Sequence, residues 1–244
     1  MTGHRPDPHA DLTALATATD RLLADAAALG ADDIAAPSRL PGWTRGHLLA
    51  HLARNADALV NVLAGRPMYP GEDARNADIE RDADRPPAVH LDDLRTASDR
   101  FAEAAGRLTD AQWDTVVAFR NGVTGPAGAV PLRRWIEVEL HHVDLDIGRT
   151  VAQLDQAFLR RAPGYLADRY RGHPAVPPLD LRADDGRQWV TGTPAPAGTA
   201  APATALTVSG TPAALVGWLS GRTDGGDLAV DRATGAALPA LPPL

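Results

Sequence analysis

The sequence contains no cysteine in its 244 residues. This absence excludes disulfide bonds, thiolate metal ligands and a cysteine nucleophile. If the protein's reaction needs a sulfur atom, that atom must therefore come from a cofactor.

Long apolar runs and an excess of positive charge are also missing. No stretch reaches the roughly 18 apolar residues of a membrane span, and the first residues lack the apolar core of a secretory signal. The net charge is −7, so we expect no nucleic-acid or membrane partner. A negative net charge is still compatible with a local basic pocket that binds an acidic small molecule. We expect a cytoplasmic monomer.

Residues 133–148 have the pattern of a helix, with no proline or glycine before Gly148, which we expect to cap its C-terminus. Glu137 and His141 are four residues apart, so they project from one face of this helix. A carboxylate and an imidazole directed into a bundle interior are costly to bury without a partner. A divalent metal is one such partner.

A second helix, predicted over residues 45–64, supplies the missing ligand of a metal site. Thr44 is placed to cap its N-terminus, and His51 lies on it one turn after His47. Two histidines and one carboxylate form a known catalytic zinc set that leaves one coordination position open. We therefore predict that His51, Glu137 and His141 bind a metal, although the same spacing also occurs on solvated helix faces.

Neighbouring polar residues compete for the same role. His47 could be a ligand, a residue behind a ligand, or a surface residue. Asp144, three residues after His141, could orient that imidazole or bond another helix. We expect Glu139 and His142 to project from other faces, toward solvent or into interhelical hydrogen bonds.

The spacing of apolar residues predicts an α+β protein of two domains, residues 1–150 and 151–244. The first is expected to be an antiparallel four-helix bundle with helices over residues 11–29, 45–64, 90–108 and 133–148. Residues 32–39 read as a connector, residues 68–87 as a polar loop with a short helix over 74–80, and residues 113–130 as turns with a short hairpin.

The second domain is expected to be a small α+β module. Helices are predicted over residues 154–171 and 212–219, and strands over 178–183, 188–192, 204–209 and 227–230. Residues 194–202 are rich in Pro, Ala, Gly and Thr and form a low-complexity connector.

Three further residues have both a structural and a functional interpretation. Trp43, in the turn of residues 40–44, is expected to be a core residue whose turn sets the start of the following helix. Arg222, just beyond a helix end, and Arg75, in the polar loop, are either solvated charges or guanidinium forks that bind a carboxylate.

Residues 40–59, LPGWTRGHLLAHLARNADAL, and 137–145, EVELHHVDL, closely resemble the signatures of mycothiol-dependent maleylpyruvate isomerases. Residues 218–222, WLSGR, resemble the C-terminal module of the same family. The resemblance implies a DinB-like four-helix bundle with a zinc site, followed by a sterol-carrier-like α+β domain. It implies His51, Glu137 and His141 as the metal ligands, and Arg222 as the arginine needed for activity and for binding the cofactor.

The implied reaction is the cis–trans isomerisation of maleylpyruvate to fumarylpyruvate in gentisate degradation, an aromatic breakdown pathway. A thiolate that adds to the alkene makes the former double bond a rotatable single bond, and elimination then releases the trans isomer. Mycothiol would supply the thiol and Zn²⁺ would deprotonate it. Arg222 and Arg75 would hold the carboxylates of the dicarboxylate substrate.

Two other functions are compatible with these residues. One is another mycothiol-dependent zinc enzyme on the same scaffold, such as a thiol S-transferase or a detoxifying enzyme. The other is a non-catalytic binding module in which the metal is structural, which a fourth protein ligand such as His47 would favour.

Overall fold

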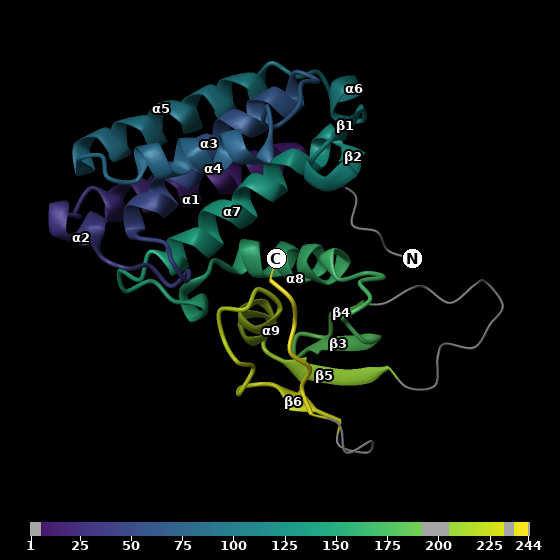
Figure 1. Cartoon of the computed structure of the whole chain (residues 1–244). Coiled ribbons are helices and arrows are strands. Elements are labelled where there is room, and N and C mark those ends of the chain that lie inside the picture. The colour runs from purple at the N-terminus through teal and green to yellow at the C-terminus, as the bar shows by residue number, and fades with distance from the viewer. Residues whose placement is uncertain (1–5, 192–204, 232–236, 244) are drawn as a thin grey trace. The chain divides into compact units, whose positions relative to one another are not determined.

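The computed structural model describes residues 6–191, 205–231 and 237–243, and the chain divides into two compact units, Met1–Arg149 and Thr150–Leu244 (Figure 1). The predicted α+β fold class is confirmed, with a helical N-terminal unit and a sheet in the C-terminal one. The predicted connector over residues 194–202 lies outside the described residues. Within the described ranges, no helix is long and apolar enough to cross a membrane.

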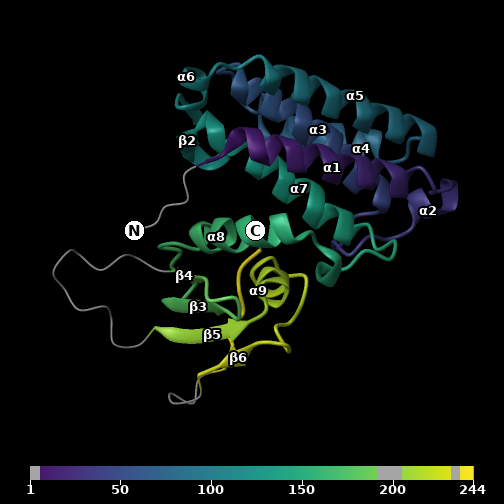
Figure 2. The same ribbon diagram turned by 180° about the vertical axis from the view of Figure 1, so that it is seen from behind.

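The first unit is a four-helix bundle of α1 (Pro8–Ala26), α3 (Arg45–Leu63), α5 (Pro87–Gly106) and α7 (Val130–Asp144). Helix α3 packs against α5 and α7, and α1 packs against α7 and α5 (Figure 2). Leucine and alanine side chains on their facing sides are buried and form the core. The four long helices predicted from apolar spacing are all present, with ends shifted by a few residues.

Helix α3 begins where the sequence predicts. The Thr44 hydroxyl accepts a hydrogen bond from the backbone N–H of His47 at 3.3 Å, and the Thr44 N–H donates to Nδ1 of His47 at 3.2 Å. This reciprocal pair satisfies two of the N–H groups that a helix start leaves free. The cap fixes the direction of α3 and thus the place from which His51 projects.

Helix α7 ends earlier than predicted, at Asp144, so the assignment of Gly148 as its cap is wrong. Other chain segments take up the last carbonyl groups of the helix. The backbone N–H of Arg39 donates to the Asp144 carbonyl at 2.8 Å, and the Arg45 guanidinium donates to the Leu145 carbonyl at 2.6 Å. Because these tertiary bonds satisfy the helix end, the chain leaves the helix before reaching the glycine.

Shorter elements connect the bundle helices. The predicted connector over residues 32–39 contains a short helix, α2 (Ala31–Ala35), so that expectation is wrong in part. The predicted hairpin is present as β1 (Val116–Ala118) paired antiparallel with β2 (Thr124–Pro126). Between α5 and α7 lie also α6 (Asp110–Trp113), η1 (Arg120–Gly122) and η2 (Ala127–Ala129), whereas η3 (Val151–Gln153) belongs to the second unit.

The polar segment after α3 forms a longer helix than predicted, α4 (Glu72–Asp82). Ion pairs attach it to the bundle, because the buried Asp82 carboxylate lies 2.6 Å from Arg85 and 3.5 Å from Arg54 of α3. Gly46 of α3 permits a close approach, since a Cβ there would lie 2.0 Å from the Ala83 carbonyl oxygen. Helix α4 is therefore held against α3 beside His51.

The second unit has a four-stranded sheet in the order β4–β3–β5–β6, built from Leu179–Ala183 (β3), Gln188–Val190 (β4), Leu206–Gly210 (β5) and Ala229–Val230 (β6). Strands β3 and β5 are parallel and the other pairs are antiparallel. Helices α8 (Gln156–Arg169) and α9 (Pro212–Leu219) pack against each other and on the sheet.

A buried polar cluster joins α7 to α1. Glu139 accepts from Arg149 at 2.6 Å and lies 3.6 Å from Arg21 of α1. His142 is 1% exposed and bonds the Asp25 carboxylate of α1 at 2.9 Å. The expectation of interhelical bonds for Glu139 and His142 is confirmed, and the solvent alternative is wrong.

The buried His142 makes the stability of the protein depend on pH. Burial, followed by the positive charge of Arg149, lowers the pKa of His142 to about 4, below the value of about 6.5 for an unfolded chain. The contribution of His142 to the free energy of unfolding is therefore fully present above pH 6.5. It is lost as the pH falls toward 4, because the unfolded state takes up the proton first. At pH 5 the expected loss from this residue is about 2 kcal/mol.

Urea denaturation at pH 7 and pH 5 tests this prediction. His142→Gln should reduce the difference in unfolding free energy between the two pH values. The same substitution at the exposed His9 should leave the difference as in the wild type. An unchanged difference in His142→Gln would show that His142 does not titrate as we infer.

Candidate metal centre

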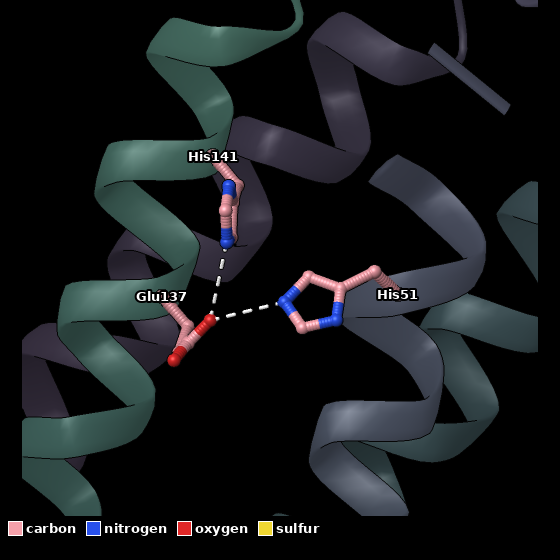
Figure 3. A group of neighbouring side chains, drawn as sticks. All are labelled: His51, Glu137 and His141. Atoms are coloured by element: carbon pink, nitrogen blue, oxygen red, sulfur yellow. Dashed lines mark hydrogen bonds and ion pairs between the residues drawn. The ribbon is translucent and has the colours of Figure 1, made fainter. Parts of the chain in front are cut away.

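Three side chains from α3 and α7 point toward one another inside the bundle (Figure 3). Oε2 of Glu137 lies 3.1 Å from Nε2 of His51 and 3.2 Å from Nε2 of His141. The two imidazole rings lie edge to face, with centroids 4.8 Å apart. The predicted residues are thus brought together by helix spacing on α7 and by packing of α3 against it.

Asp144 lies behind His141. Its carboxylate is 2.9 Å from Nδ1 of His141, which leaves Nε2 directed at the group. Burial alone would lower the pKa of His141, but its hydrogen bonds to Asp144 and Glu137 raise that pKa above the usual value. Of the two roles considered for Asp144, the structure shows the orientation of the imidazole.

The carboxylate of Glu137 is held in its ionised form. Burial, the largest single influence, would raise its pKa, but hydrogen bonds to His141 and His51 outweigh burial and hold the pKa of Glu137 well below its usual range. Burial also lowers the pKa of His51 to about 4, so this imidazole is neutral at pH 7. An ionised carboxylate and a neutral imidazole are the forms that bind a metal.

Trp43 packs on the histidines of α3 and is only partly buried, so the expectation of a core residue is wrong. Its ring stacks on His47 at 6.2 Å between centroids and lies tilted against His51 at 5.5 Å. The residue directly before the helix cap lies beside the first two turns of the helix, which explains these contacts. Trp43 therefore forms one wall of the metal centre.

His47 does not belong to the group. Its Nδ1 is engaged by Thr44 at 2.7 Å, and its Nε2 lies 3.3 Å from Glu80 of α4. Both ring nitrogens are thus directed away from Glu137. Among the described residues, no fourth His, Asp or Glu joins the three donors.

Arg75 lies at the centre, as α4 brings its Nη2 to 3.2 Å from Nδ1 of His51. Its guanidinium is also 6.0 Å from the ring centroid of Tyr69, a residue that sequence analysis does not single out. Arg222 lies in the second unit, just after α9, where its Nη1 donates to the Ser220 carbonyl at 2.5 Å. The structure thus places Arg75 beside the three donors. The described contact of Arg222 is with a residue of the second unit.

The donor set fits a zinc ion. Each residue offers one ligand atom, and the three atoms lie within 4.8 Å of one another. Tetrahedral zinc with bonds of about 2.0–2.2 Å places its ligand atoms roughly 3.3 Å apart, close to the two distances from Glu137. Asp144 behind His141 is the supporting carboxylate that such an imidazole ligand usually has.

Comparison with known proteins gives one family and one fold. A family model described as the mycothiol maleylpyruvate isomerase N-terminal domain matches residues 15–146. Crystal structures of the mycothiol-dependent maleylpyruvate isomerase, and of a histidine-to-alanine mutant of it, match with a TM-score of 0.83 and 24% identity, covering 99% of this chain and 98% of that chain. No curated protein matches the sequence. At 24% identity, the structural likeness establishes the fold alone.

Proposed function

The chain belongs to the mycothiol maleylpyruvate isomerase N-terminal domain family, and from this premise we propose that it is a mycothiol- and zinc-dependent maleylpyruvate isomerase. The observation that carries the proposal is the convergence of His51, Glu137 and His141 on one point between α3 and α7. The family match confirms the resemblance seen in residues 40–59 and 137–145.

The residues of this chain would hold Zn²⁺ with two imidazoles and one carboxylate, and three protein ligands leave a position open for a fourth. When bound, zinc lowers the pKa of a thiol, which supplies the nucleophile that a chain without cysteine lacks. Asp144 orients His141 through Nδ1. The Trp43 ring packs against His51 and limits the positions that this imidazole can take.

A cation beside this centre suits a dicarboxylate substrate. Arg75 is half-buried and lies next to His51, where its charge would attract a substrate carboxylate and stabilise negative charge that develops during the reaction. We assign the second carboxylate or the cofactor to Arg222. This assignment rests on the family resemblance of residues 218–222.

The test is an assay with zinc-loaded protein, mycothiol and maleylpyruvate, followed by loss of the enol absorbance of the substrate. We expect turnover only when mycothiol and metal are both present. Treatment with a chelator should abolish it, and adding zinc should restore it. Turnover without mycothiol, or none with every component present, would contradict the proposal. Zinc binding without isomerisation would favour another mycothiol-dependent reaction on this scaffold.

A further inference from the structure

A buried arginine with no acidic partner lies next to the metal centre. Arg134 of α7 is 1% exposed, and no described carboxylate lies within ion-pair distance of it. Its Nη2 has no hydrogen-bond partner among the described residues. Burial lowers the pKa of Arg134 to about 10, so the guanidinium still carries its charge at neutral pH. The charge of Glu137 acts in the other direction and raises this pKa. Burying a guanidinium without a direct ion pair is nevertheless costly, which calls for an explanation.

The position of Arg134 on α7 ties it to the ligands. It lies three residues before Glu137 and seven before His141, so the three side chains project from one face of the helix, one turn apart. That face meets α3. Arg134 is therefore part of the same contact between helices that brings the ligands together.

The contacts of Arg134 on α3 lie just after His51 in the sequence. Its Nη1 donates to the Leu52 carbonyl at 2.8 Å and to Oδ1 of Asn55 at 3.0 Å. Leu52 directly follows His51, and Asn55 lies one turn after it on the same face. Nη1 of Arg134 thus holds α3 at two points, and both lie close to His51, the residue that must meet Glu137.

We propose that Arg134 is a positioning residue of the metal centre, which joins α3 to α7 one turn from the ligands and fixes the separation at which His51 meets Glu137. The inference rests on the proposed metal site but not on the identity of the substrate. The two helices contribute ligands separately, one from α3 and two from α7. Their relative placement therefore decides whether the three donor atoms fit a single ion.

The test measures metal binding directly. Zinc affinity would be determined by competition with a chromophoric chelator, and ligand geometry from the visible absorption of the Co²⁺-loaded protein. Arg134→Met should fold, bind zinc about 10- to 100-fold more weakly, the range for residues that support a ligand, and show altered Co²⁺ bands. Arg134→Lys should restore most of the affinity, because one ammonium can replace the single nitrogen that makes both bonds.

Arg133→Met is the matched control, because the Arg133 guanidinium lies over the Phe119 ring instead, 3.9 Å from its centroid. It should bind zinc as the wild type does. Wild-type affinity and Co²⁺ bands in Arg134→Met, or no recovery in Arg134→Lys, would overturn the proposal. If Arg134→Met does not fold, Asn55→Ala replaces it, and unchanged zinc affinity in that variant would overturn the proposal equally. Failure of the wild type to bind zinc would refute the metal centre itself.

Discussion

Replacing His51 with alanine should abolish metal binding and lower the proposed isomerase activity by about a thousandfold or more. His51 is the only candidate ligand that α3 contributes among the described residues, so its loss would leave two donors on one helix. A metal that acts as a Lewis acid is worth several kcal/mol to a reaction, and each 1.4 kcal/mol is a factor of ten in rate. The measurements are the zinc content after gel filtration and kcat/KM with mycothiol and maleylpyruvate.

The matched control is His47→Gln, one turn earlier on the same helix. His47 bonds Thr44 and Glu80 and lies outside the donor group, so this variant should keep its zinc and its activity. Glutamine at this position can still accept from the Thr44 N–H, as in a capping box, so the stability should change little. Equal activity in His51→Ala and the wild type would refute the metal mechanism, and loss of zinc from His47→Gln would show that the second histidine is a ligand.

The three residues of the candidate metal centre could be singled out from the sequence because their relation is local on each helix. Glu137 and His141 are four residues apart, and periodicity alone puts them on one face. Thr44 marks the start of the other helix and so gives the turn on which His51 lies. That the two faces meet is a tertiary fact. The prediction that they meet came from the way in which metal sites are built between the helices of a bundle, and the family resemblance of two sequence segments supported it.

Other parts of the centre depend on contacts that apolar spacing does not reveal. Helix α4 carries Arg75 to the site, yet buried ion pairs of Asp82, rather than a stripe of apolar residues, attach it to the bundle. Arg134 looks like an ordinary charged position in an amphipathic helix, and only its contacts with α3 show that it is buried. Sequence patterns indicate which residues can form a helix more reliably than which polar residue is enclosed by its neighbours.

The largest loss of stability without direct damage to the centre is expected from Glu139→Gln. The Glu139 side chain is 1% exposed, and that of its partner Arg149 is 11% exposed. Removing one member of a buried ion pair typically costs about 3–5 kcal/mol, because the other charge stays buried without compensation. For a protein of this size each 1 kcal/mol lowers Tm by roughly 2–4 °C, so we expect a decrease of about 10 °C in a thermal melt.

The same substitution at Glu103 is the control, because its pair with Arg107 is exposed on both sides and should contribute less than about 1 kcal/mol. Glu139 bonds toward α1 and Arg149, away from the ligands, so folded Glu139→Gln at 20 °C should bind zinc with nearly wild-type affinity. Arg134→Met should weaken zinc binding and lose less stability than Glu139→Gln, because it removes two hydrogen bonds to α3 but no direct ion pair. If both variants lost stability and affinity together, α7 would be acting as one unit, and the separation that we draw between its α1-facing and α3-facing sides would be wrong.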